Sequence, residues 1–217
     1  MKRPARAPVL FGGRPVIAFN EEVDRRRFLR GAAIIGVGGT LAVTTARDPV
    51  AFAQAPMGDL DILNYALTLE YLESDFYMQG LGAGILQGRE MELVEPIGQH
   101  EAAHVTALTD TITQLGGMPV AQPMFTYPPN TFTDRAAFLM TASTFEELGV
   151  TAYHGQVVNI DNKDILAAAA AIAGSESRHA AILADLTGGN PFPAPVEATR
   201  TMEEVLAIAM PFIAQGS

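Results

Sequence analysis

The sequence contains no cysteine and no tryptophan in its 217 residues. Without cysteine, the chain can form no disulfide bond, thiolate zinc site or iron–sulfur cluster, and it has no cysteine nucleophile. Long hydrophobic runs are also missing. The apolar run at residues 31–46 has 16 residues, whereas a membrane-spanning helix needs about 20. The length itself fits one medium-sized domain with a leader.

Basic residues are scarce beyond the N-terminal quarter of the chain. Nine of the 14 Lys and Arg residues, but only four of the 24 acidic residues, lie before residue 54. The five bases and 20 acids that remain give residues 54–217 a formal charge of −15. A surface this acidic repels nucleic acid and anionic lipid. We therefore expect no nucleic-acid partner.

The early basic residues belong to a segment with the features of an export signal. Residues 25–30 read RRRFLR, which resembles the twin-arginine pattern R-R-x-F-L-K. The apolar run follows, and then a small-residue cleavage site that ends at Ala53. We predict a signal peptide at residues 1–53 that addresses the twin-arginine export machinery, and a location in the periplasm or on the outer face of the cytoplasmic membrane. An uncleaved leader that anchors the same domain is the alternative.

Residues 54–217 predict an all-α domain. Apolar residues recur at helical spacing over residues 59–80, 88–115, 134–158 and 161–187. In the second of these, Pro96 and Gly98 should kink or irregularly wind the first turns. The connection at residues 116–133 has four prolines and no period, which suits a crossover that runs the length of a bundle.

A short helix at about residues 200–214 completes the predicted fold. Thr201 and Glu204 have the spacing of a capping box, which marks a helix start. The whole pattern therefore predicts a four-helix bundle with a long crossover between its second and third helices.

Two of the predicted helices carry a glutamate and a histidine three residues apart. These pairs are Glu101 with His104 and Glu176 with His179. A projection at 100° per residue places both pairs on the apolar stripe of their helix, facing the interior. One histidine on an apolar face is more often a hydrogen-bonded core residue, so it is the repetition that favours a metal site.

The other two helices carry a glutamate and a tyrosine seven residues apart. These are Glu70 with Tyr77 and Glu146 with Tyr153, again on the inward stripes. From each of these glutamates to the glutamate of the following Glu-x-x-His pair there are 31 and 30 residues. The near-equal offset indicates two pseudo-symmetric helical hairpins.

This register selects Glu70 over Glu73 and Glu146 over Glu147 as inward carboxylates. With the glutamates of the two Glu-x-x-His pairs, four carboxylates then converge in the interior. They cannot all stay ionised without a counter-charge, and the nearest base, Arg178, is rotated toward solvent. Two divalent cations would supply the charge, and mixed oxygen and imidazole ligands suit iron or manganese.

This ligand pattern is that of the di-iron and di-manganese helical bundles, and the chain resembles the ferritin-like superfamily. More narrowly, it is similar to exported ferritin-like domain proteins of the desiccation-related type over about residues 59–188, in LNYALTLEYLESDFY, HEAAHV, ELGVTAYHG and SESRHAAIL. The resemblance implies a ferritin-like bundle with bridging Glu101 and Glu176. The full implied ligand set is Glu70, Glu101, His104, Glu146, Glu176 and His179.

Tyr77 and Tyr153 have two interpretations. Each phenol can hydrogen-bond a ligand carboxylate across the bundle, since a buried hydroxyl needs a partner. A redox role beside the metals is the alternative.

The remaining histidines and the methionines are not expected among the metal ligands. His100 and His154 lie off the inward stripe, and we expect them at the surface. The nine methionines, Met78 and Met140 included, are expected to fill the core rather than to bind metal.

The resemblance implies a di-metal centre that oxidises Fe(II) or reacts with oxygen or peroxide. One alternative is a di-iron oxygenase of an organic substrate, which needs an apolar pocket beside the metals. Another is an envelope protein for stress or desiccation protection, in which the metals only stabilise the bundle. The expected partners are metal ions, oxygen or peroxide and the export machinery, and a homodimer stays open.

Overall fold

The computed structural model describes residues 58–214, so the signal peptide predicted at residues 1–53 lies outside the described residues. The elements are α2 (Asp59–Gly82), α3 (Arg89–Gln114), α4 (Arg135–Gln156), α5 (Lys163–Leu186), α6 (Met202–Ala209) and the 3-10 helix η2 (Met210–Phe212). Within residues 58–214, β pairing is limited to one isolated bridge between Phe125 and Ile213. The prediction of an all-α fold is confirmed.

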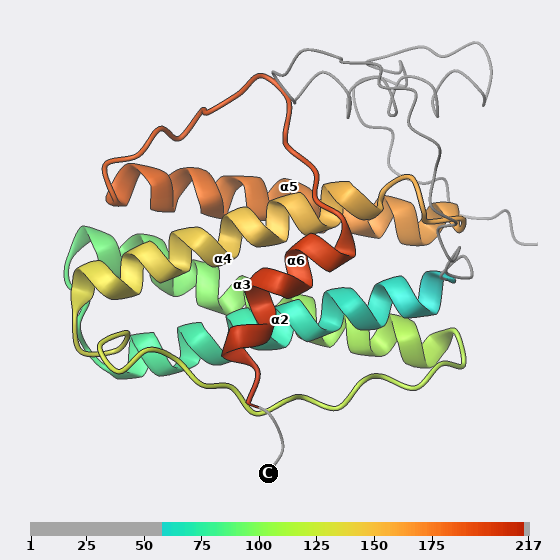
Figure 1. Cartoon of the computed structure of the whole chain (residues 1–217), viewed down its shortest axis with the longest axis horizontal. Helices are drawn as coiled ribbons and strands as arrows, with labels where there is room; N and C mark the ends of the chain where they lie inside the picture. Colours follow the sequence, from blue (N-terminus) through green and yellow to red (C-terminus); the bar gives the residue numbers. More distant parts are fainter. Residues whose placement is uncertain (1–57, 215–217) are drawn as a thin grey trace, which may run out of the picture.

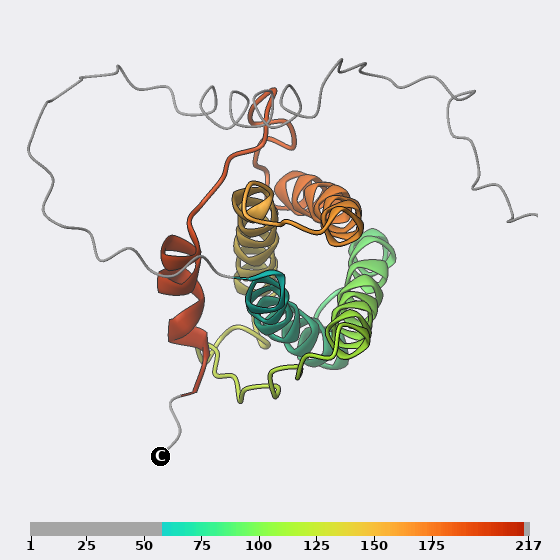
Figure 2. The same ribbon diagram turned by 90° about the vertical axis from the view of Figure 1, so that its right-hand side faces the viewer.

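The four long helices form a bundle. Figure 1 shows α2, α3, α4 and α5 lying side by side along the long axis of the molecule. The end view in Figure 2 shows them around a common centre, with α2 next to α3 and α4 next to α5, and with α6 outside the bundle beside α2 and α4. None of the helices in residues 58–214 has the length and hydropathy that crossing a membrane requires.

The helix starts follow from local side-chain chemistry. Asp134 accepts a hydrogen bond from the Ala137 amide at 2.8 Å and caps α4. Asn162 caps α5 in the same way. The Thr201 hydroxyl accepts from the Glu204 amide at 3.2 Å while the Glu204 carboxylate accepts from the Thr201 amide at 2.8 Å. The predicted capping box is therefore present at the start of α6.

The crossover spans residues 115–134 and runs along the bundle from the end of α3 to the start of α4 (Figure 1). It is held against α2 by side chains. Asn64 accepts from the Val120 amide at 2.7 Å, and the Tyr127 hydroxyl donates to Asp75 at 2.8 Å. The crossover thus connects helices that an ordinary short turn could not join.

The core differs between the two ends of the bundle. One end is filled by aromatic rings: Phe76 stacks on Phe138 with ring centroids 4.7 Å apart and meets Phe145 edge-on at 5.1 Å. The other end is aliphatic, with Leu67 and Ile112 fully buried. The polar residues of the predicted site lie between these two apolar regions.

The structure corrects two expectations about particular residues. The α3 helix is regular α-helix through Pro96, so the expected irregular winding is not found, while the expected kink stays a prediction. Gly98 serves a close approach, since a Cβ there would lie 3.0 Å from the Cβ of Tyr77 on α2. Met78 and Met140 do not fill the core, because their exposed fractions are 67% and 66%.

Candidate metal centre

The structure brings the six predicted ligands together in the middle of the bundle. Glu70 comes from α2, Glu146 from α4, and one Glu-x-x-His pair each from α3 and α5. Two groups form, in each of which the possible ligand atoms lie within 4.8 Å of one another. The first consists of Glu70, Glu101, His104 and Glu176, and the second of Glu101, Glu146, Glu176 and His179.

Glu101 and Glu176 belong to both groups. Each has two carboxylate oxygens and stands on a helix that faces the other, α3 and α5 respectively. If each group held a cation, Glu101 and Glu176 would be the residues shared between the two, whereas Glu70 and Glu146 each belong to one group. All four carboxylates have an exposed fraction of 0%.

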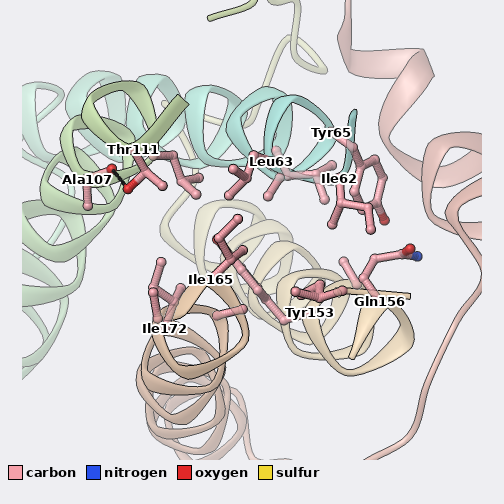
Figure 3. Close-up of a pocket in the computed structure, with 16 residues that line it drawn as sticks. Ile62, Leu63, Tyr65, Ala107, Thr111, Tyr153, Gln156, Ile165 and Ile172 are labelled. Carbon is pink, nitrogen blue, oxygen red and sulfur yellow. Dashed lines mark hydrogen bonds between the residues drawn. The ribbon is translucent and has the colours of Figure 1, made fainter. Parts of the chain in front are cut away.

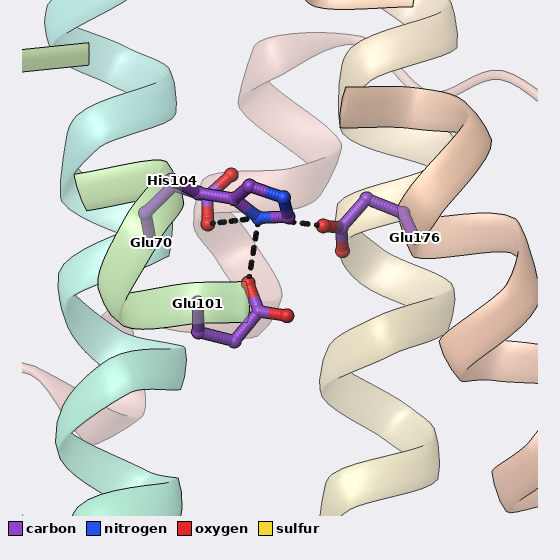
Figure 4. Close-up of side chains that lie close together, drawn as sticks. All are labelled: Glu70, Glu101, His104 and Glu176. Carbon is purple, nitrogen blue, oxygen red and sulfur yellow. Dashed lines mark hydrogen bonds and ion pairs between the residues drawn. The ribbon is translucent and has the colours of Figure 1, made fainter. Parts of the chain in front are cut away.

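The contacts of His104 show how closely the first group converges (Figure 4). Its Nδ1 lies 3.2 Å from Glu70 Oε2, 3.1 Å from Glu101 Oε2 and 3.2 Å from Glu176 Oε1. A ring nitrogen carries at most one hydrogen, so it can donate to only one of these three oxygens. The other two oxygens face the same point without a hydrogen-bond donor.

The second group repeats this arrangement around His179. Its Nδ1 lies 3.0 Å from Glu101 Oε1 and 3.1 Å from Glu146 Oε2. Again, one nitrogen faces carboxylate oxygens from two helices and can donate to only one of them.

Several buried carboxylate oxygens have no hydrogen-bond partner. These are Oε2 of Glu70, Oε1 of Glu101 and both oxygens of Glu176. Buried polar atoms in folded proteins are nearly always paired, and this deep in the bundle an unpaired carboxylate oxygen is costly. These carboxylate oxygens and imidazole nitrogens are the ligand types that metal ions take in proteins, and the residues could therefore hold metal.

Burial is the main influence on the carboxyl groups. It raises the pKa of Glu70 and Glu146 well above the ordinary value, and the neighbouring Glu176 raises both further. Burial also acts on Glu101, but its contacts with His104 and His179 outweigh burial and lower its pKa to about 2. Without metal, the site therefore holds protons that metal ions would displace.

The two tyrosines reach across the bundle to the other hairpin. The Tyr77 hydroxyl on α2 donates to Glu146 Oε1 on α4 at 2.6 Å, and the Tyr153 hydroxyl on α4 donates to Glu70 Oε1 on α2. These reciprocal bonds are the ones predicted under the structural interpretation of both phenols. They leave the second oxygen of each carboxylate directed at a histidine nitrogen.

Glu73 is a buried carboxyl, so the prediction that Glu70 and not Glu73 faces the interior is wrong for Glu73. Its exposed fraction is 3%, and burial together with Glu176 and Glu146 raises its pKa well above the ordinary value. Glu73 is three residues from Glu70, or 60° on a helical projection, so both share one face. The opposite helix has Gly149 there, which leaves room for the Glu73 side chain.

His100 is exposed, as expected, but it also contacts the site. Its Nδ1 lies 2.9 Å from Nε2 of His179, and the two rings stack with centroids 5.1 Å apart. His154, in contrast, has one hydrogen-bond partner within residues 58–214, the Val150 carbonyl of its own helix. The sequence of α3 alone could not predict the contact between His100 and His179, because it joins two different helices, α3 and α5.

A helical bundle with inward Glu and Glu-x-x-His ligands defines the ferritin-like class of proteins. The family model described as "Ferritin-like domain" matches residues 58–189. The chain therefore belongs to the ferritin-like domain family.

Among solved structures, a hypothetical protein from Methanococcus jannaschii is similar to this chain. The two share 14% sequence identity and a TM-score of 0.49, over 76% of this chain and 98% of the other. A comparison with curated proteins found no match.

Proposed function

We propose that this protein is a di-metal carboxylate protein that binds two iron or manganese ions and oxidises Fe(II) or reacts with oxygen or peroxide. The observation that supports it best is the pair of overlapping ligand groups that share Glu101 and Glu176. Two adjacent ions joined by carboxylates supply the redox chemistry that oxygen or peroxide needs. Membership of the ferritin-like domain family supports the same function.

In this proposal the chain's own residues bind and position the two ions. Glu101 and Glu176 bridge them, and His104 and His179 give each ion one imidazole ligand. Two divalent cations balance the four negative charges of Glu70, Glu146 and the two bridging carboxylates. The Tyr77 and Tyr153 hydroxyl groups hold the terminal carboxylates in place.

The test is aerobic addition of Fe(II) to metal-free protein. We expect ferric absorbance to appear faster than in buffer alone, with two metals bound per chain. Glu101→Ala should bind neither metal, whereas Glu147→Ala, an exposed residue beside Glu146, should behave as the unmodified chain. Two metals bound to Glu101→Ala would overturn the ligand assignment.

One outcome would favour a different function. If metal raises the melting temperature but Fe(II) oxidation is no faster than in buffer, the metals only stabilise the bundle. The protein would then act in envelope stress or desiccation protection without turnover.

An oxygenase acting on an organic molecule is a second candidate. The observation that favours it is an apolar cavity that approaches the site along the bundle axis. A molecule consumed together with oxygen would distinguish it from an Fe(II) oxidase.

We further propose that the protein is exported in the folded state through the twin-arginine route. The support is the RRRFLR segment and the apolar run after it. A protein that folds before export takes its metal from the cytoplasm, so the route would determine whether iron or manganese is bound. Protein sent through a route for unfolded chains should contain a different metal, and identical metal from both routes would contradict this idea.

A further inference from the structure

An apolar cavity of about 60 Å³ lies inside the bundle, toward the end at which α2 begins (Figure 3). All four long helices contribute to its wall, with Leu63, Leu108 and Ile165 among the lining residues. A cavity needs about 10–15 Å³ to hold one water-sized group, so this one has room for several connected atoms.

The cavity begins about one helical turn from the candidate metal centre. Ala66 lines it on α2, four residues before Glu70, and Ile172 lines it on α5, four residues before Glu176. Four residues of helix correspond to about 6 Å. A molecule in the cavity would therefore lie close to the buried carboxylates, while the wall residues Ala107 on α3 and Ala168 on α5 are themselves exposed to solvent.

One polar atom in the cavity wall has no partner. Tyr65 lines the cavity with an exposed fraction of only 8%, and its hydroxyl is buried without a hydrogen bond. Burial raises its pKa, so the hydroxyl keeps its hydrogen and can donate. The amide of Gln156 lies at the same end of the cavity (Figure 3), with its Oε1 already accepting from Asn159 at 3.0 Å.

We propose that this cavity binds a small, neutral, largely hydrocarbon molecule with one carbonyl or hydroxyl oxygen, which accepts a hydrogen bond from Tyr65. A charged molecule would lose its hydration without finding an ionic partner in the apolar wall itself. A molecule without oxygen would leave the Tyr65 hydroxyl unpaired.

The wall of the cavity includes Tyr153, whose hydroxyl donates to Glu70. The occupant would thus contact the ring that positions a candidate metal ligand. The equivalent ring of the other hairpin, Tyr77, is enclosed by Phe76 and Phe138. Binding itself does not depend on the proposed function, but the occupant's role as organic substrate of the metal centre rests on the second candidate, an oxygenase.

The test is binding of cyclohexanone to the full chain, measured by calorimetry or saturation-transfer NMR, with cyclohexane as the match without oxygen. Tyr65→Phe keeps the ring and removes the donor, so we expect cyclohexanone to bind about 3- to 10-fold more weakly and cyclohexane to bind equally well. Tyr71→Phe, a partly buried tyrosine of the same helix that does not line the cavity, should bind both as before.

A second variant tests the position of the bound molecule. Ala169→Phe places a ring into the cavity and should abolish binding of both molecules while two metals still bind. Glu101→Ala, expected to lack metal, should still bind cyclohexanone, so failure of the cavity and failure of the metal site give different results. The proposal is overturned if cyclohexanone does not bind the unmodified chain, or if Tyr65→Phe binds it with unchanged affinity.

Discussion

Gly149 on α4 stands three residues after Glu146, as Glu73 on α2 stands three residues after Glu70. A Cβ at Gly149 would lie 2.6 Å from Glu176 Oε2 and 3.3 Å from Glu73 Oε1. The space beside Gly149 therefore accommodates the carboxylates of Glu176 and Glu73. The position of the Glu176 carboxylate therefore depends on the absence of a side chain at Gly149.

We predict that Gly149→Ala displaces Glu176 and weakens metal binding by about tenfold or more, the range typical of changes next to metal ligands. Gly174→Ala is the matched control, because it is also in a helix and a Cβ there meets nothing within 4 Å. It should leave metal binding unchanged and stabilise the fold by about 0.5–1 kcal/mol. Equal metal affinity in both variants, measured by competition with a chelator, would contradict the prediction.

His100 allows a second test of support around the metal. Its contact with Nε2 of His179 fixes the orientation of that ring. His100→Ala should lower metal affinity by about tenfold, whereas His154→Ala, with no contact to the site, should not change it. If the two variants bind metal alike, the His100 contact has no role in holding His179.

The sequence pattern was sufficient to find the six candidate ligands and the two tyrosine hydrogen bonds. Both follow from inward positions on helices at fixed spacing, which a projection captures. The pattern missed Glu73 because the choice between Glu70 and Glu73 depends on the size of the residue opposite, Gly149. It missed the His100 contact because nothing within one helix reports on a ring from another helix.

Gly80 lets α2 approach α4 closely. A Cβ at Gly80 would lie 1.9 Å from the ring of Phe138, which packs against α2 there. The same ring stacks on Phe76, so it cannot move away freely. Helix contact at the aromatic end of the bundle thus requires a residue without a side chain.

We predict that Gly80→Ala destabilises the protein by about 1–3 kcal/mol, as overpacked cores usually do. For a chain of this length this corresponds to a fall in melting temperature of about 3–10 °C. Gly82→Ala, in the same helix with no atom within 4 Å of its Cβ, should not lower it. Thermal unfolding followed by circular dichroism measures the melting temperature of both variants. Equal values would show that the Phe138 ring can move aside to make room for the new Cβ.

The helix boundaries were largely predictable because capping residues and glycines mark them locally. Asp134 and Thr201 act as caps where the sequence indicated a start. Whether a methionine is buried or exposed was not predictable from its hydropathy alone, as the exposed Met78 and Met140 show. The hollow in the aliphatic end also depends on packing between helices, which no single segment encodes.

The buried acids connect the stability of the whole bundle to pH. The pKa values of Glu70, Glu73 and Glu146 are raised, first by burial, and those of His104 and His179 are raised to about 12 and about 10 by their carboxylate partners, against burial. A group whose pKa is higher in the folded state stabilises the fold at low pH. That contribution is lost as the pH rises through the folded-state value.

We therefore predict that metal-free protein becomes less stable as the pH rises above about 4.5, the ordinary pKa of these carboxyl groups. The melting temperature should fall by about 5–10 °C between pH 5 and pH 8. Among the buried acids of residues 58–214, Glu101, with its lowered pKa, acts in the opposite direction, and it does so at more acidic pH.

Metal ions should largely remove this dependence, because they replace the protons between the carboxylates. The measurement is thermal unfolding at pH 5 and pH 8, with metal and after its removal by a chelator. If the melting temperature of the metal-free protein rose with pH, the prediction that ionisation of the buried acids destabilises the fold would be contradicted.

The unequal pair formed by Glu73 and Gly149 has a consequence for how such a chain could have arisen and could be rebuilt. Two copies of the first hairpin would place a further glutamate at the position where Gly149 now leaves room for Glu73 and Glu176. Two copies of the second would leave that space without Glu73. The halves of this bundle are complementary rather than interchangeable, so neither could be duplicated to regenerate the whole.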